Sequence, residues 1–386
     1  MTQLYGNFIF GSILDQTFAD GRANTLNSSV SGDIIQQTPL GLNSLPSSKN
    51  LYGRAAGVVP RRLYFACGAL VVVVTATFTS FAQTAPNKLI VTASGARLRE
   101  RPETGAPEVG RLTLGAVVDL LERSADKSRV GAAEEFWYSV SAPGGARGWV
   151  FGGLVAPFAP AQRDAAYLKL ARDRLASAAA NFAELSELVR FLDRATVEVR
   201  AREALAELEL ARLVALARSL AAMPFEHLSE PPYKSWTDER EKEVVYSEPA
   251  GQWYVRAELF WNLQRRYAGL SAAERAAWEG AQTPLPGECE GYLPCYLSME
   301  METNGKYLKL YPRGAHADAA LKALSELLGQ IAEDLRGSHP VYEVPPADRA
   351  NFRQSVARLR AQLAPVPAAK KARVSAQLDA IARHFP

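Results

Sequence analysis

Histidine and cysteine, which supply many catalytic bases, nucleophiles and metal ligands, are scarce in this sequence. Four histidines and three cysteines occur among 386 residues, and the histidines are scattered. No His-Glu-x-x-His zinc motif, Gly-x-Ser-x-Gly nucleophile turn or Gly-x-x-x-x-Gly-Lys phosphate loop is present. These absences predict a protein that is not an enzyme and that binds neither a cofactor nor a metal.

The sequence also has little excess of charge of either sign. Lysine and arginine number 44 against 41 aspartates and glutamates, and the two signs are interspersed through most of the chain. A nucleic-acid-binding protein concentrates basic residues on one face, so no nucleic-acid partner is predicted. A length of 386 residues, 48% of them hydrophobic, predicts two or three globular domains.

One long segment has no charge at all. Residues 63–82 read LYFACGALVVVVTATFTSFA and directly follow Arg61 and Arg62. A basic flank, an apolar run and a small-x-small ending are typical of a secretory signal, and the run is also long enough to span a bilayer as a helix. Residues 61–83 are therefore predicted to be a signal peptide or a transmembrane anchor, with cleavage favoured over retention. The basic flank places residues 83–386 outside the cytoplasm, periplasmic or membrane-anchored.

The N-terminal residues 1–60 are rich in Ser, Asn, Gln, Gly and Thr and show only weak apolar periodicity. Such a composition predicts a disordered tail. Two explanations for a tail before an export segment remain open. Either it is a genuine cytoplasmic tail before a retained anchor, or translation starts at Val58 or Val59.

Short β-rich segments divided by turn residues follow the apolar run. Several short strands at intervals near ten residues predict a compact all-β barrel or sandwich, and about seventy residues suffice for the smaller barrel. The expected strands lie at residues 89–91, 96–99, 109–112, 116–121, 136–140 and 148–150.

Four submotifs in this segment resemble the bacterial SH3 (SH3b) domain. They are Leu98-Arg99-x-x-Pro102, Val109-Gly110-x-Leu112-x-x-Gly115-x-x-Val118, Trp137-Tyr138-x-Val140, and Gly148-Trp149-Val150 with Leu154. The resemblance implies an SH3-like β-barrel over residues 87–158 that binds a peptide or cell-wall ligand and has no catalysis of its own. The charged residues 124–135 depart from the family pattern and are expected to form a solvated loop.

Aromatic and arginine side chains are the candidate ligand contacts of this barrel, because these residue types dominate binding hot spots. Tyr138, Phe151, Arg99 and Arg101 are predicted to line a groove. The two tryptophans, Trp137 and Trp149, are predicted instead to pack in the barrel core.

Residues 161–223, between Pro160 and Pro224, contain no glycine or proline and are dominated by Ala, Leu, Arg and Glu; residues 161–224 are treated as one segment. Apolar residues recur at every third or fourth position over residues 168–199, which predicts an amphipathic helix, and a second register starts at Leu205. Two packed helices that break within residues 193–202 are expected, with one very long helix as the alternative. The apolar seam could also support a homodimer.

Residues 225–386 are predicted to form an α-helical domain. Its Tyr311-Pro312 turn faintly resembles the helical hairpins of tetratricopeptide-like proteins, although no thirty-four-residue repeat is present. The expected elements are a linker at 226–233, a strand at 243–247, an aromatic-rich helix at 253–267 with Phe260 and Trp261 buried, a helix that starts at a Ser271-x-x-Glu274 capping box, an amphipathic helix ending at Arg336, and closing helices at 348–363 and 368–384.

Cys289 and Cys295 bracket a turn that contains glycine and proline. In an exported chain this pattern predicts a disulfide. A metal site with Glu288, Glu290 or His316 as further ligands is the alternative. Two cysteines without a matching histidine spacing make the metal site the weaker interpretation.

These features predict an exported, non-enzymatic binding or scaffold protein whose partner is a peptide, a cell-wall glycopeptide or an envelope protein. The SH3b resemblance also admits a peptidoglycan hydrolase, because such domains often accompany peptidases that use a Cys–His pair. Here the cysteines are expected to be bridged to each other. The remaining catalytic alternative is a helical domain with a carboxylate pair drawn from Glu288, Glu290, Glu300 and Glu302.

Overall fold

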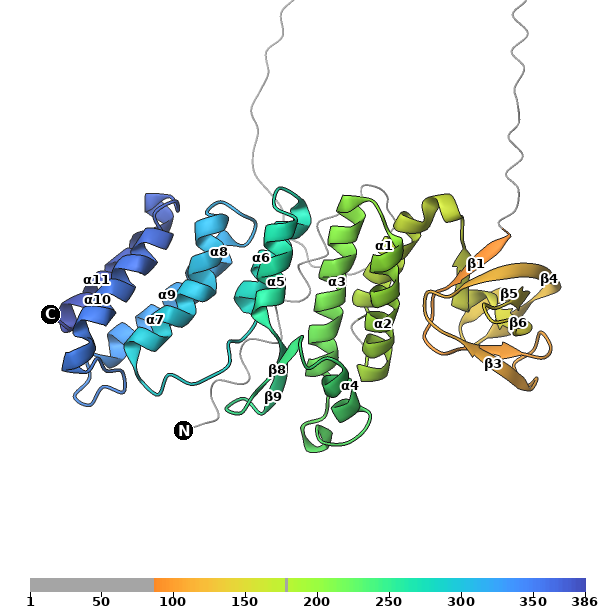
Figure 1. The fold of residues 1–386 in the computed structure, drawn as a ribbon, viewed down its shortest axis with the longest axis horizontal. Helices are drawn as coiled ribbons and strands as arrows, with labels where there is room; N and C mark the ends of the chain where they lie inside the picture. The colour runs from red at the N-terminus through yellow and green to blue at the C-terminus, as the bar shows by residue number, and fades with distance from the viewer. Residues whose placement is uncertain (1–86, 178–179) are drawn as a thin grey trace, which may run out of the picture. The chain divides into compact units, whose positions relative to one another are not determined.

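The computed structural model describes residues 87–177 and 180–386. The tail and the apolar export or anchor segment predicted for residues 1–60 and 61–83 lie outside this part of the chain. No helix within the described ranges is long and apolar enough to cross a membrane. A curled β-sheet region is followed by a mainly helical region, as predicted (Figure 1).

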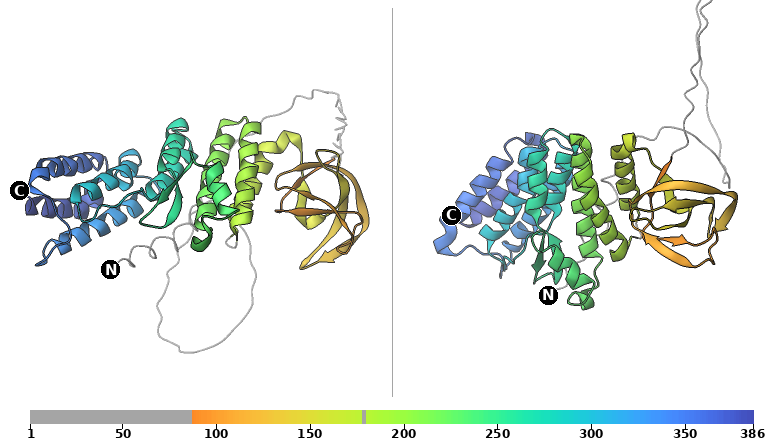
Figure 2. Two further views of the ribbon diagram at one scale, coloured as in Figure 1. Left: turned by 60° about the horizontal axis from the view of Figure 1, so that its bottom comes forward. Right: turned by 45° about the vertical axis from the view of Figure 1, so that its right-hand side comes forward.

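Seven strands form one curled sheet over residues 88–157, termed the barrel below (Figure 2). Their order in the sheet is β3-β2-β6-β5-β4-β1-β7. Alternate residues of the strands point inward, and Leu89, Leu98, Val118, Val140 and Val150 are among the side chains of the barrel core. The strands are β1 Lys88–Val91, β2 Ala96–Arg99, β3 Glu108–Leu112, β4 Val117–Val130, β5 Ala133–Ser141, β6 Arg147–Phe151 and β7 Val155–Pro157.

The prediction of a solvated loop at residues 124–135 was wrong, because these residues continue β4 and β5 into a long hairpin. Val130 pairs with Ala133 across a two-residue turn, and Gly131 adopts the positive φ of 60° that such a turn requires. A two-stranded ribbon that extends beyond the core exposes both of its faces. Its strands therefore carry charged residues and lack the apolar alternation by which a strand is recognised.

Three helices occupy residues 163–221, where two were predicted. The expected break is present between α2 (Phe182–Glu198) and α3 (Arg202–Ala221), but α1 (Arg163–Leu175) ends before α2 begins. A capping box starts α2: the Glu184 N–H donates to Asn181 Oδ1 at 3.1 Å, and the Asn181 N–H donates to the Glu184 carboxylate at 3.3 Å. The sequence contains this Asn-x-x-Glu pattern, but the apolar periodicity continues across it, so the start of α2 was not predicted.

The predicted strand, amphipathic helix and closing helices of residues 225–386 are confirmed. Trp253 lies in a strand instead of the expected helix, while Phe260 and Trp261 are buried as predicted. Three helices, α4, α7 and α8, and the strand β9 were not predicted. The elements are α4 Tyr233–Glu239, β8 Val244–Ser247, β9 Gln252–Val255, α5 Ala257–Arg266, α6 Ser271–Gln282, α7 Leu293–Glu302, α8 Asn304–Leu310, α9 Ala317–Asp334, α10 Arg349–Gln362 and α11 Ala368–His384.

The capping box predicted at the start of α6 is absent. Leu270 occupies the N-cap position and Ser271 is already helical. The Glu274 carboxylate instead accepts hydrogen bonds from Tyr307 Oη at 2.9 Å and from the Ala315 N–H at 2.6 Å. These two bonds hold the Tyr-Pro turn between α8 and α9 against α6. The Glu274 carboxylate therefore makes a tertiary contact and is not available for a local cap.

Neighbouring helices pack as pairs, with α2 beside α3 and α5 beside α6 (Figure 1). The barrel contributes Ile90, Leu114 and Phe158 to the hydrophobic core formed with the first helices. The Leu114 N–H donates to Glu187 Oε1 at 2.7 Å, and Arg194 donates to the Leu114 carbonyl at 3.0 Å. The turn between β3 and β4 is therefore fixed to α2 by both apolar and polar contacts.

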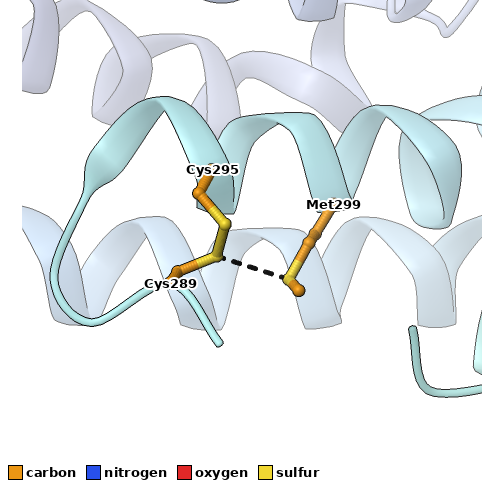
Figure 3. Close-up of a disulfide and its surroundings, with 3 residues drawn as sticks. All are labelled: Cys289, Cys295 and Met299. Carbon is orange, nitrogen blue, oxygen red and sulfur yellow. Dashed lines mark hydrogen bonds between the residues drawn. A yellow bond between two sulfur atoms is a disulfide. The ribbon is translucent and has the colours of Figure 1, made fainter. Parts of the chain in front are cut away.

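The predicted disulfide joins Cys289 to Cys295, with their Cα atoms 5.5 Å apart (Figure 3). Cys295 lies in the first turn of α7, and Cys289 in the loop before it is 7% exposed. The Met299 Sδ lies 3.5 Å from the Cys289 Sγ. Because a disulfide sulfur carries no proton, this is a van der Waals contact. The bridge closes the entry loop onto the start of α7.

Replacing both cysteines by serine is expected to lower the free energy of unfolding by roughly 2 kcal/mol, because the bridge restricts a short loop of the unfolded chain. Urea denaturation of C289S/C295S beside the oxidised wild type measures this loss. A reductant should move the wild-type midpoint to that of the variant and leave the variant unchanged. Equal midpoints for the oxidised wild type and the variant would contradict the expected contribution.

Candidate functional site

A row of side chains crosses the outer face of the barrel sheet. Arg99 of β2 pairs with Glu108 of β3 and with Trp149 of β6, and Trp149 pairs with Ser139 of β5. Directly paired residues of antiparallel strands project on the same side of the sheet. Val150, the neighbour of Trp149, is fully buried in the barrel core, so the row faces outward. Glu108, Arg99, Trp149 and Ser139 are termed the tryptophan row.

The outward position of Trp149 corrects the prediction that its ring packs in the barrel core. The side chain is half-buried and does not belong to the core cluster. Strand alternation contained the signal: in Gly148-Trp149-Val150, an inward valine requires an outward tryptophan. This alternation, which was not used in the prediction, decides the side of the sheet on which the ring lies.

Trp137 is buried as predicted, but in a separate aromatic pair. Its ring lies edge-on to Phe151, the residue opposite it in β6, with centroids 5.5 Å apart. Trp137 and Phe151 are only 3% and 5% exposed. The pair lies on the same side of β5 and β6 as Ser139 and Trp149, by the same alternation. It is therefore a covered aromatic pair two residues along the strands from Ser139 and Trp149.

The four predicted ligand residues do not converge on one groove. Phe151 is buried in the pair just described, and Tyr138 packs against the barrel core beside Gly152. Arg101 is exposed in the loop after β2, where it pairs with Glu103 at 3.0 Å. Of the four, only Arg99 lies in the tryptophan row.

Arg99, the strand partner of Trp149, is held in place by a hydrogen bond. Its Nη1 donates to the Ala106 carbonyl at 2.7 Å, which ties the guanidinium to the loop between β2 and β3. A hydrogen bond from Arg111 lowers the pKa of Glu108, and the charges of Arg97 and Arg99 act in the same direction. One ionised carboxylate thus stands among three arginines, so this part of the surface combines an aromatic ring with excess positive charge.

Comparison with known protein families identifies this region. Residues 94–156 match the family model of the bacterial SH3 domain. The barrel is a bacterial SH3 domain. The match contains the whole tryptophan row and confirms the resemblance predicted from the four submotifs. Neither a curated protein nor a solved structure matches the chain, and the residues outside the SH3 domain are not assigned to a family.

A second candidate site lies in the helical region. A cavity of about 290 Å³ opens between α3 and α5, near the end of α2. Its lining combines three leucines with charged and polar side chains. The lining residues are Thr196, Glu209, Arg212, Leu213, Glu243, Leu259, Asn262, Leu263 and Arg266.

An ion network forms one wall of this cavity. Arg212 donates to Glu243 through both terminal nitrogens, at 2.6 and 3.0 Å, and its Nε donates to Asp193. Arg240 closes the network with a 2.7 Å bond to Asp193. Burial alone would raise the pKa of Asp193, but the hydrogen bonds from Arg240 and Arg212 outweigh it and hold that pKa below its usual range. The network is ionised and internally neutral.

The cavity does not present the carboxylate pair that a hydrolase would use. Glu243 is bound by Arg212, and both oxygens of Glu209 accept from Arg266, at 3.0 and 2.8 Å. None of the four glutamates considered for catalysis, Glu288, Glu290, Glu300 and Glu302, lines it. Burial raises the pKa of Glu300, although a hydrogen bond from Asn304 opposes the shift.

The alternative metal site also finds no support in the described ranges. Cys289 and Cys295 are bonded to each other, and His316 stacks on Trp278 with ring centroids 4.6 Å apart. No group of three His, Cys, Asp or Glu side chains in this part of the chain is placed to hold a metal ion.

Proposed function

We propose that the protein is an exported, non-enzymatic binding protein of the bacterial envelope. Its SH3 domain binds a peptide or cell-wall ligand, and its helical region acts as a scaffold for an envelope partner. The observation that carries this proposal is the tryptophan row: a half-buried tryptophan whose strand partner is a positioned arginine, with a buried aromatic pair two residues further along the strands.

The tryptophan row suits a ligand that has both a flat or apolar part and an anionic group. Tryptophan and arginine are enriched in binding hot spots because a large rigid ring and a planar cation contribute much energy for little lost freedom. The guanidinium of Arg99 can pair with a carboxylate in a bidentate manner. Peptides and the peptide-bearing strands of the cell wall carry such carboxylates, which supports the proposed ligand class.

Trp149→Ala is expected to weaken sedimentation of the full chain with purified peptidoglycan by about thirtyfold, because truncating a hot-spot residue typically costs about 2 kcal/mol. Arg99→Gln should weaken binding in the same direction. The matched control is Arg101→Gln, which removes an exposed arginine of the same domain outside the row and should leave binding unchanged. Equal affinities for Trp149→Ala and wild type would contradict the assignment of the row.

The same assay separates the proposal from a peptidoglycan hydrolase. Retention of the protein on peptidoglycan without soluble fragments supports a binding protein. Release of fragments would replace the proposal with the hydrolase alternative. If the protein is not retained and no fragments are released, the cell wall is excluded as its ligand and the search turns to a protein partner.

Export is supported by the apolar run behind Arg61 and Arg62 and by the Cys289–Cys295 bridge, since disulfides persist in oxidising compartments. N-terminal sequencing of the mature protein tests it. A new N-terminus just after Ala82 would show cleavage, and an uncleaved chain in the membrane fraction would show an anchor. An uncleaved chain in the cytoplasm with both thiols reduced would contradict export.

A further inference from the structure

The last two helices carry a charge that the rest of the protein does not share. Residues 349–386, which contain α10 and α11, hold eight arginines and lysines and a single acidic residue, Asp379, for a net charge of +7. The whole chain has a net charge of +3, so all other residues together sum to −4. Positive and negative residues are interspersed over most of the chain, but positive residues dominate this pair of helices, which is termed the basic hairpin.

Several cations of the basic hairpin are exposed and lack a counter-ion. Arg353, Arg373 and Arg383 are exposed, and none of them has an ion-pair partner within the described ranges. The single acid of the hairpin is already paired with Arg360, and Lys370 reaches Asp318 of α9 at 2.7 Å. The unpaired guanidiniums are thus free to meet an external anion.

The remaining exposed positions leave these cations accessible. Most of the exposed uncharged residues of α10 and α11 are alanines, at positions 350, 357, 361, 368, 369, 372, 376 and 380. No Phe, Tyr or Trp side chain of α10 or α11 is exposed, and the exposed ring of His384 packs edge-on against Phe385, so the hairpin lacks the row of stacking platforms on which single-stranded nucleic acid is held. Its surface recognises an anion by charge and not by ring stacking.

The hairpin has no apolar face left to insert into a bilayer. Phe352, Val356 and Leu359 of α10 and Leu378 and Ile381 of α11 are all buried in the C-terminal core. Binding through the outer surface is therefore electrostatic. With fourteen and seventeen residues, the two helices are about 21 and 25 Å long, which is too extended for one small anion and suits a charged surface.

We propose that the basic hairpin docks on the phosphate headgroups of an anionic membrane surface. Arginine suits this role because its planar fork binds phosphate oxygens in pairs. The choice of a bilayer over another polyanion rests on the proposed export, which brings the chain to a membrane whether the uncharged run of residues 63–82 is then cleaved or retained. The peptidoglycan test of the SH3 domain is independent of this surface, so either proposal can fail alone.

The test measures binding of the full chain to vesicles of phosphatidylglycerol and phosphatidylcholine and to vesicles of phosphatidylcholine alone. The variant R353Q/R373Q/R383Q is compared with R129Q/R147Q/R313Q, which removes the same charge from exposed arginines elsewhere. Each cation near an anionic surface contributes about fivefold in affinity, so the first variant should lose roughly a hundredfold on anionic vesicles at low salt. The control should lose far less, and added salt should abolish the wild-type preference for anionic vesicles.

Three outcomes would overturn the proposal. Equal binding of the wild type to both vesicle types would show that headgroup charge is not recognised. Equal losses in the two triple variants would show that only net charge matters. Tighter binding to duplex DNA or to polyphosphate than to anionic vesicles, at the same salt concentration, would assign the basic hairpin to a different polyanion.

Discussion

Gly115→Ala is expected to lower the free energy of unfolding by roughly 2–5 kcal/mol, one of the two largest losses expected in this protein. Gly115 has a φ of 75°, a conformation that alanine adopts only with strain. A Cβ at this position would also lie 2.0 Å from Cδ2 of Phe191 in α2. The substitution combines backbone strain with overpacking at the contact between the SH3 domain and the helices.

Gly95→Ala is the matched control for this substitution. Gly95 has a similar φ of 59°, but a Cβ there would meet no atom within 4 Å. Chemical denaturation of both variants therefore separates the two effects, and Gly115→Ala should lose more stability by the cost of the steric clash. Equal losses would show that Phe191 does not pack on Gly115 in solution.

Arg212→Met is expected to lower the free energy of unfolding by roughly 3 kcal/mol at neutral pH, the low end of the range for breaking a buried ion pair. The change leaves Glu243 without its bidentate partner and Asp193 with Arg240 alone. Arg101→Met is the control, since the Arg101–Glu103 pair is mostly exposed and should contribute less than about 1 kcal/mol.

The cost of Arg212→Met should depend on pH. The folded-state pKa of Asp193 is lowered, so its ionised form stabilises the folded protein above the ordinary aspartate pKa, and that stabilisation is lost as the pH falls through the folded value. The difference in free energy of unfolding between wild type and variant should therefore be largest at neutral pH and should decrease below about pH 4. A difference that is constant from pH 7 to pH 3 would contradict the ionised network.

Local patterns in the sequence were enough to predict the main elements. The submotifs around Leu98, Trp137 and Gly148 predicted the SH3 domain because its core positions and turns have fixed spacing. The break near residue 199 and the closing helices followed from apolar periodicity, and the disulfide from two cysteines around a turn. Each of these features depends on residues that are close together in the chain.

The features that the sequence did not reveal depend on distant partners. The sequence pattern around Glu274 predicts a local helix cap, but its carboxylate accepts hydrogen bonds from Tyr307 and Ala315 instead. The network of Asp193 and Arg212 joins residues that no local pattern connects. The tryptophan row depends on which strand lies beside β6, so Arg99 was predicted as a ligand contact without Trp149, its partner in β6.

Amide hydrogen exchange with and without soluble peptidoglycan fragments is the most direct test of the central claim, that the tryptophan row is the ligand site of the SH3 domain. Protection on binding is expected in residues 96–99 and 147–151, the two strands that carry Arg99 and Trp149, and no change is expected in α5 beside the cavity. Protection confined to α3 and α5, with none in these two strands, would contradict this claim.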